Sequence, residues 1–158
     1  MGIRASRTTH TCLLNNDMVL EPNFFETLNE AFDKIPNLFS ATAQIFFPEN
    51  KRREETGKAA YKPTTPRDFP LRCETPVDGE NYTPVLYGSG GCTLYDTAKL
   101  LTIGCFKESF RPAYVEDLDT GWRGWQQGWP TVFVSGARVI HYHRATTCLL
   151  YTSDAADE

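Results

Sequence analysis

The sequence lacks the features that mark membrane-spanning, secreted and nucleic-acid-binding chains. Its 158 residues include no stretch close to the roughly 20 apolar residues that a membrane-spanning helix needs. Arg4 and Arg7 are not followed by the apolar run of a signal peptide. The longest basic run is Lys51 to Arg53 in a chain of formal charge −4, so no basic face for a nucleic-acid backbone is predicted. We therefore expect a cytoplasmic protein that binds no nucleic acid, and any nucleotide partner should be small.

Paired cysteines are also lacking. The number of cysteines is odd and none forms a C-x-x-C pair, which argues against a disulfide framework and a thiolate zinc site. The cysteines are Cys12, Cys73, Cys92, Cys105 and Cys148. Buried, reduced thiols are the simpler interpretation. With 41% apolar residues, a chain of this length is expected to form one domain around one core.

The first part of the chain predicts a strand, a helix and a second strand. The apolar run Cys12 to Leu14 stops at Asn15-Asn16-Asp17, as a buried parallel strand does at its carboxyl end, where open α/β sheets bind ligands. Pro22 suits the first turn of a helix, and apolar residues at helical spacing continue to residue 32. Apolar residues at the odd positions from Phe39 to Phe47 predict a half-exposed strand.

The rest of the chain predicts a long loop followed by shorter elements. The segment from Pro48 to Pro84 has many prolines and no sustained periodicity, which is typical of a loop. Helices are predicted at residues 97–103, after the N-cap Asp96, and from Glu116 to the stop signal Gly128, with short strands at 85–87, 131–134 and 138–142. Gly88 to Gly91 would lie between a strand and a helix. The pattern as a whole indicates an α/β fold.

Two carboxylate-bearing segments could carry chemistry. Asn15-Asn16-Asp17 offers the oxygen ligands that a hard divalent cation prefers, although an Asx turn would have the same composition. Glu116, Asp117 and Asp119 begin a helix, where capping and an i, i+4 pair between Asp119 and Arg123 explain part of the pattern. Capping does not need three carboxylates, so one of them could serve as a general base for a hydroxyl nucleophile.

Glycines, histidines and tryptophans give further candidates. Gly88, Gly90 and Gly91 permit positive φ and a close backbone approach to a ligand, although a tight turn without a ligand is the alternative. No Gly-Lys-Ser/Thr follows, which excludes a P-loop. His141 and His143 share one strand face, where a histidine either binds metal or has no ligand. The helical stripe of Trp122, Trp125 and Trp129 packs in a core or, at a rim, stacks on a sugar ring.

Together these segments resemble the family 2 glycosyltransferases of the GT-A fold, in particular the rhamnosyltransferase-like branch that builds bacterial surface polysaccharides. The matching segments, in the order of the family, are LLNNDMVLEPNFF (13–25), YGSGGCTLYD (87–96), VEDLDTGWRGWQQGW (115–129) and VIHYHRATT (139–147). The resemblance implies a partial GT-A fold with a mixed sheet and flanking helices over residues 12–147. Residues 1–11 remain unassigned, and residues 148–158 are expected to be a non-native or disordered tail.

The resemblance implies a metal site. Asn15, Asn16 and Asp17 correspond to the Asp-x-Asp motif of the family in its Asn-Asn-Asp variant, so Asp17 is expected to hold Mg²⁺ or Mn²⁺ on the donor diphosphate. Asn15 takes the place of the leading carboxylate, which makes His141 the predicted second metal ligand.

The resemblance also implies a catalytic base and contacts to the donor. Glu116-Asp117 matches a Glu-Asp pair whose second residue is the base, so Asp117 is the predicted catalytic residue. Gly90 and Gly91 would let the backbone approach the donor sugar, and Arg123 would assist the diphosphate.

The implied activity is transfer of a sugar from a nucleotide diphosphate donor to a hydroxyl group of a glycan or lipid-linked acceptor, with inversion at the anomeric carbon. This activity is compatible with peripheral contact to a membrane. Family members begin with a nucleotide-binding β-α-β region, which would precede Leu13, so we expect this chain to be a fragment that binds nucleotide-sugars weakly and turns over none. A non-catalytic carbohydrate- or partner-binding domain is the alternative. A metal-dependent hydrolase would need more His and carboxylate ligands.

Overall fold

The computed structural model describes residues 2–48, 53–61, 71–110 and 115–142, and within them one mixed sheet organises the chain. Its strands are β1 (His10–Leu14), β2 (Met18–Leu20), β3 (Ser40–Phe46), β6 (Thr83–Val85), β7 (Cys92–Asp96) and β8 (Thr131–His141). The order is β1-β7-β3-β8-β2, with β6 also paired to β8. Only β3 and β8 run parallel among the pairs of this described sheet. The predicted mixed sheet of an α/β fold is therefore confirmed.

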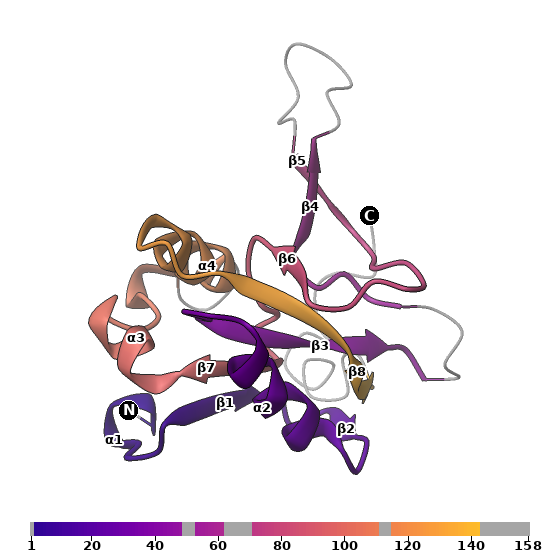
Figure 1. Ribbon diagram of the computed structural model, residues 1–158, viewed down its shortest axis with the longest axis horizontal. Coiled ribbons are helices and arrows are strands. Elements are labelled where there is room, and N and C mark those ends of the chain that lie inside the picture. Colours follow the sequence, from indigo (N-terminus) through magenta and orange to yellow (C-terminus); the bar gives the residue numbers. More distant parts are fainter. Residues whose placement is uncertain (1, 49–52, 62–70, 111–114, 143–158) are drawn as a thin grey trace, which may run out of the picture.

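The helices flank this sheet. They are α1 (Gly2–Ala5), α2 (Phe24–Lys34), α3 (Thr97–Thr102) and α4 (Glu116–Gln126), with a 3-10 turn η1 (Glu108–Phe110). Figure 1 shows α1, α3 and α4 at one end of the sheet and β2 at the other. Phe24, Leu28 and Ala31 are fully buried on α2, which packs against β3 and β8 as the helical spacing predicts.

The strand β3 is fully buried, whereas the alternating pattern predicts a half-exposed strand. Its apolar residues lie in the core with α2, and its polar residues form hydrogen bonds on the opposite face. The hydroxyl oxygens of Ser40 and Thr131 are 2.8 Å apart, and those of Thr42 and Thr93 are 3.0 Å apart. The expectation of exposure is wrong because hydroxyls that form hydrogen bonds with one another can be buried at little cost. An alternation of apolar and polar residues therefore does not show whether the polar face of a strand contacts water or other polar side chains.

The strand β1 also differs from the expectation of a buried parallel strand. It is partly buried and antiparallel to β7, with Leu13 opposite Thr93, and β7 is its only partner among the described strands. A short apolar run has no periodicity that reveals its direction or its depth. Asn15 to Asp17 nevertheless follow the carboxyl end of β1, as predicted.

The proline-rich segment contains more regular structure than the loop predicted there. It contains a separate two-stranded antiparallel sheet, β4 (Lys58–Tyr61) and β5 (Leu71–Glu74), which projects from the main sheet in Figure 1. At its end begins β6, which overlaps the strand predicted at 85–87 only at Val85. The glycine segment from Gly88 to Gly91 therefore joins two strands, β6 and β7, rather than a strand and a helix. These strands are three or four residues long, too short for a period-two signal to appear.

Local signals along the second half of the chain agree better with the structure. Asp96 Oδ1 accepts from the Lys99 amide 2.9 Å away and caps α3, as predicted. Gly104 and Gly128 follow α3 and α4 with φ of 84° and 74°. The two strands predicted after Gly128 form one strand, β8, whose register against β3 shifts where Val134 and Arg138 pair with successive residues. Such an irregularity interrupts the alternation of apolar and polar residues, so the sequence predicts two strands where the structure has one.

None of the helices in the described ranges has the length and apolar character that a membrane crossing needs. The proposed tail, residues 148–158, and the predicted ligand candidate His143 lie outside those ranges.

Candidate active site

Three segments far apart in the sequence meet at one edge of the sheet. The Asn15 amide donates to the Gly91 carbonyl over 3.0 Å, so the turn after β1 lies against the glycine segment. On the other side of that segment, a Cβ placed on Gly90 would lie 4.0 Å from Asp117 Oδ2. The glycine segment is therefore the link between Asn15 and the start of α4. The structure thus brings together the segments that the sequence singled out.

The glycines of this segment are needed for space rather than for positive φ. None of Gly88, Gly90 and Gly91 has a positive φ, so that part of the expectation is wrong. A Cβ on Gly91 would lie 2.8 Å from Asn15 Nδ2, whereas the nearest atom to a Cβ on Gly90 would be 3.9 Å away. Gly91 is therefore a packing requirement, and Gly90 leaves room beside Asp117.

Hydroxyl groups of the sheet fix the glycine segment. The Ser89 amide donates to Thr42 Oγ1 over 3.2 Å, and Thr93 Oγ1 donates to the Ser89 carbonyl over 2.6 Å. The polar layer on β3 and β7 is thus continuous with the site. A loop tied to central strands in this way presents its backbone in one conformation.

Asp17 and His141 are neighbours because of the pairing between β2 and β8. Met18 is opposite His141 in the register, and the Tyr142 amide donates to the Asp17 carbonyl over 2.9 Å. The Nε2 atom of His141 lies 3.4 Å from Asp17 Oδ1, which is buried and has no hydrogen-bond partner among the described residues. His141 Nδ1 is 2.7 Å from Glu54 Oε2. The histidine is therefore held between two carboxylates.

Asp117 occupies a partly buried position beside a cavity of about 600 Å³, which is also lined by Tyr87, Ser89 and Glu54. Burial raises the pKa of Asp117 above its ordinary value, and the charge of Glu116 adds to this. Hydrogen bonds from the backbone of Leu118 and Gly90 counteract the shift only in part. A carboxylate with a raised pKa that borders a cavity is a stronger base than an exposed one.

Glycine contacts also position Tyr87 over this cavity. A Cβ on Gly57 would lie 1.8 Å from the Tyr87 carbonyl oxygen, and one on Gly121 would lie 2.5 Å from the Leu86 carbonyl oxygen. The backbone at 86–87 thus runs between the segment before β4 and helix α4. Burial raises the pKa of Tyr87 above its ordinary value.

Asp119 and Arg123 form the predicted i, i+4 pair. Arg123 Nε donates to Asp119 over 2.8 Å, and the guanidinium also donates to the carbonyls of Ile103 and Cys105. Burial alone would raise the pKa of Asp119, but hydrogen bonds from Arg123 and Lys107 outweigh it, so this pKa lies below its usual value. Arg123 lines neither cavity. Its diphosphate contact stays a prediction and is not part of the site proposed below.

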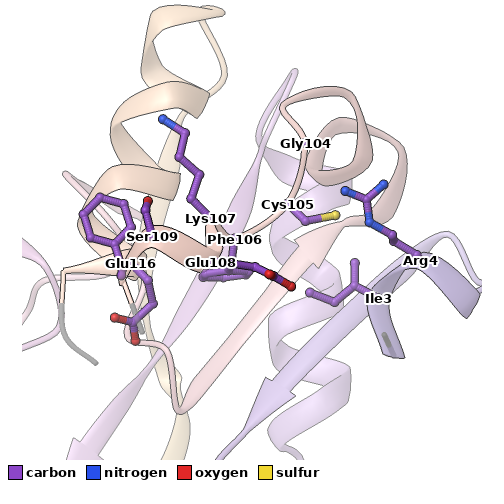
Figure 2. Close-up of a pocket in the computed structure, with 10 residues that line it drawn as sticks. Ile3, Arg4, Gly104, Cys105, Phe106, Lys107, Glu108, Ser109 and Glu116 are labelled. Carbon is purple, nitrogen blue, oxygen red and sulfur yellow. The ribbon is translucent and has the colours of Figure 1, made fainter. Parts of the chain in front are cut away.

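A second cavity of about 610 Å³ lies on the other side of the start of α4. Figure 2 shows it between Ile3 and Arg4 on one side and Glu116 on the other, with Lys107 and Glu108 along its wall. Lys107 and Glu108 are exposed, and Lys107 pairs with Asp119 over 3.3 Å. Glu116 and Asp117 therefore line different cavities, although they are consecutive in the sequence.

The tryptophan stripe divides between packing and exposure. Trp125 Nε1 donates to the Val85 carbonyl over 2.9 Å, and Trp129 stacks against Phe39 with ring centroids 6.4 Å apart. Trp122 is 54% exposed. The packing interpretation therefore applies to two of the three.

Glu54 is the residue of the site that the sequence interpretation missed. It lies in a charged run that the prediction assigned to a loop, and no spacing in that run relates it to His141, 87 positions away. Only the tertiary structure brings the two together.

The atoms around Asp17 and His141 fit a divalent cation. No group of three or more His, Cys, Asp or Glu side chains is arranged around one ion in the part of the chain that the structure describes. Asp17 Oδ1 and His141 Nε2, at 3.4 Å, have the spacing of two neighbouring ligands. Mg²⁺ and similar ions are often bound by one or two protein groups, with phosphate oxygens and water as the other ligands. The buried, unbonded Oδ1 of Asp17 is a further feature that a cation would satisfy.

A comparison with known families agrees with this arrangement. Residues 1–155 match the sequence profile described as "Glycosyltransferase like family 2". This chain belongs to that family. A search of curated proteins by sequence finds no significant match for this family 2 chain.

Among solved structures, the family 2 chain is similar to the "Crystal structure of GalNAc-T7 with UDP, GalNAc and Mn2+". The TM-score is 0.63 at 12% sequence identity, with 89% of this chain and 29% of the other chain covered. At that identity the likeness establishes the GT-A-like fold alone, and the family 2 chain spans less than a third of the GalNAc-T7 chain.

Proposed function

We propose that this chain forms the cation-binding and base-bearing part of a glycosyltransferase, which transfers a sugar from a nucleotide diphosphate donor to a hydroxyl acceptor. Membership in glycosyltransferase-like family 2 supports the reaction class. The presence of UDP, GalNAc and Mn²⁺ in the similar crystal structure supports a nucleotide-sugar and a divalent cation as ligands here.

One observation carries this proposal: Glu54 connects the two functional groups. Its carboxylate is 2.7 Å from His141, which adjoins Asp17, and it lines the same cavity as Asp117. Asp17 and His141 do not line that cavity themselves, so Glu54 is the link between the proposed cation ligands and the cavity of Asp117. Binding of a donor diphosphate at the cation and of an acceptor beside Asp117 would orient the reacting atoms, and orientation supplies much of the rate of a transfer reaction.

In the proposed reaction the acceptor oxygen attacks the anomeric carbon of the donor sugar. Its proton passes to the carboxylate of Asp117, and the bond from the anomeric carbon to the diphosphate oxygen breaks. Asp117 is suited to this step because its pKa is raised while it borders the cavity. Gly90 leaves room beside that carboxylate, so a substrate can approach it closely. Attack from the face opposite the diphosphate would invert the anomeric configuration.

Asp17 and His141 would hold Mg²⁺ or Mn²⁺, which would supply positive charge to the diphosphate leaving group. Asn15 and Asn16 lie on the same turn, and Asn15 also supports the glycine segment. The finer parts of the proposal are hexosyl or rhamnosyl transfer, a glycan or lipid-linked acceptor, surface polysaccharide biosynthesis and a cytoplasmic location. They rest on the resemblance of the four sequence segments.

The test measures Mn²⁺-dependent binding of UDP and other nucleoside diphosphates by calorimetry, with the wild-type chain and with Asp17→Asn. Transfer from labelled nucleotide-sugars is followed with the chain and with a protein that includes the β-α-β region implied by the resemblance. Cation-dependent nucleotide binding that Asp17→Asn weakens supports the proposal. Binding of sugars without any nucleotide or cation dependence would instead support the carbohydrate-binding alternative and contradict the transferase.

A further inference from the structure

We propose that Glu54 is a positioning residue for the cation site: its carboxylate fixes the tautomer and the orientation of His141, so that Nε2 faces Asp17 and the cation. The inference rests on the proposed function for the presence of a cation. Its geometric part concerns only three side chains of this chain, Glu54, His141 and Asp17.

The two distances assign the ring hydrogen to Nδ1 when Glu54 is ionised. An ionised carboxylate only accepts hydrogen bonds, so the contact of 2.7 Å between Glu54 Oε2 and His141 Nδ1 requires a hydrogen on Nδ1. The contact between Nε2 and Asp17 Oδ1 is longer, 3.4 Å, and Oδ1 receives no hydrogen bond from the described residues. A neutral ring with its hydrogen on Nδ1 therefore presents the lone pair of Nε2 toward Asp17.

The backbone at Glu54 is fixed, which a positioning residue needs. The Glu54 amide donates to the Ile45 carbonyl over 3.0 Å, at the end of β3, and Arg53 forms a β-bridge with Phe46. Arg53 also donates to the Pro76 carbonyl over 3.1 Å and forms an ion pair with Asp78. The carboxylate is thus presented from a segment that is attached to the sheet on one side and to residues 76–78 on the other.

Histidines that bind metals usually donate their other ring N–H to a carboxylate, a carbonyl or water, and this contact orients the ring and raises its basicity. Glu54 meets that description because it contacts His141 on the nitrogen farther from Asp17. It also lies between the cation site and the cavity of Asp117. Removing such an outer contact typically weakens metal binding about 10- to 100-fold.

The first experiment measures Mn²⁺ binding to the complete chain by electron paramagnetic resonance of the free ion. Glu54→Gln is expected to raise the dissociation constant about 10- to 100-fold. The control is Glu26→Gln, which removes an exposed carboxylate of α2 that lines neither cavity and should leave Mn²⁺ affinity within about twofold. Asp17→Asn and His141→Asn serve as variants of the direct ligands and should weaken binding at least as much as Glu54→Gln.

The second experiment detects the tautomer without metal, by ¹⁵N nuclear magnetic resonance of the His141 ring. The wild-type ring should show a protonated Nδ1 and an unprotonated Nε2. In Glu54→Gln the amide can donate as well as accept, so this preference should be lost while thermal unfolding shows the fold intact. A purely structural role for Glu54 would alter stability without changing the tautomer.

The outcomes separate the two proposals. If Asp17→Asn and His141→Asn weaken Mn²⁺ binding but Glu54→Gln alters neither affinity nor tautomer, the role of Glu54 is overturned and the proposed function stands. If none of the three variants changes Mn²⁺ binding, the cation lies elsewhere and both proposals are overturned.

Discussion

Two cavities of nearly equal volume lie on either side of the start of α4, and their chemistry differs. The cavity near Glu54 and Asp117 contains a carboxylate with a raised pKa, and Glu54 joins it to the buried contact between Asp17 and His141. The cavity near Glu116 is bordered by exposed charged groups such as Lys107, which pairs with Asp119. Volume alone does not separate the two sites.

Their links to other parts of the candidate site separate them. Exposed charges that pair with one another are largely screened by water, and such pairs contribute little. A buried carboxylate oxygen without a hydrogen bond keeps the full cost of its lost hydration until a ligand or an ion satisfies it. Among the described residues such oxygens occur on both sides, Asp17 Oδ1 on one and Glu116 Oε2 on the other. Of the two cavities, the one beside Asp117 is joined through Glu54 to the contact between Asp17 and His141, so we expect the proposed cation and acceptor there.

The largest expected effect follows from removing the base. In a protein that carries out transfer, Asp117→Asn should lower the transfer rate about 10²- to 10⁴-fold, because a positioned base contributes about that much. Donor affinity should change little, since the proposed contact of Asp117 is with the acceptor. Glu116→Gln, in the other cavity, is the control and should retain most activity. If Glu116→Gln abolished transfer and Asp117→Asn did not, Glu116 would be the base and the cavity near Glu116 would be the active site.

A large effect on stability is expected at Gly121. A Cβ there would lie 2.5 Å from the Leu86 carbonyl oxygen, and backbone cannot yield as a side chain can. Gly121→Ala should therefore lower the free energy of unfolding by about 1 to 3 kcal/mol, measured by urea denaturation. Gly90→Ala, whose Cβ meets no atom closer than 3.9 Å, is the matched control and should cost less. Equal losses of stability in the two variants would show that Gly121 and the backbone at residues 86–87 are not tightly packed.

A smaller effect is expected on the stability of Asp117→Asn, which should increase at neutral pH, whereas Gly121→Ala lowers stability. Because the folded pKa of Asp117 lies above the unfolded value, the folded state binds more protons between the two, and stability is lost as pH rises through that window. Asn does not titrate. The variant should therefore melt at a higher temperature than the wild type at neutral pH, and the gain should vanish below the unfolded pKa of an aspartate. A gain that persists in acid would exclude desolvation as its cause.

Removing the structural carboxylate should have a modest effect. Asp119→Asn loses the pair with Arg123, which is worth about 0.2 to 0.5 kcal/mol for an i, i+4 pair. Because the pKa of Asp119 is lowered, the stability that its charge contributes is present above the unfolded pKa and is lost as pH falls through the folded value. Chemical denaturation at neutral and acidic pH checks this. Mn²⁺ binding should be unchanged, and a change would assign Asp119 to the site.

The smallest effect is expected in the second cavity. Glu108 is exposed, so Glu108→Gln should change the free energy of unfolding by less than about 0.5 kcal/mol and leave Mn²⁺ affinity and transfer unchanged. The same denaturation and binding measurements suffice. Loss of acceptor affinity in this variant would show that both cavities take part in the reaction.

The sequence predicts features that depend on neighbouring residues better than features that depend on distant ones. Asp96 caps α3 and Asp119 pairs with Arg123 as predicted, because each interaction spans three or four positions. The burial of β3 was not predictable, because its polar face is satisfied by Thr93 and Thr131 from other strands.

For the site, the sequence singles out Asp17, Asp117 and His141, and the structure places Asp17 beside His141. Glu54 was not predictable, because nothing in its local sequence specifies a partner 87 positions later.

The parallel pairing of β3 with β8 has a consequence for how the protein folds. Ser40 and Thr131 meet across this pair although 91 positions separate them, and a long loop must close before their contacts form. Chains dominated by such distant pairings fold slowly, with much of their apolar surface exposed on the way. Because β8 also carries His141 to Asp17, the proposed cation site requires this closure. We therefore expect that a cation at the proposed site would stabilise the chain only after β3 and β8 have paired, and not the states that precede this pairing.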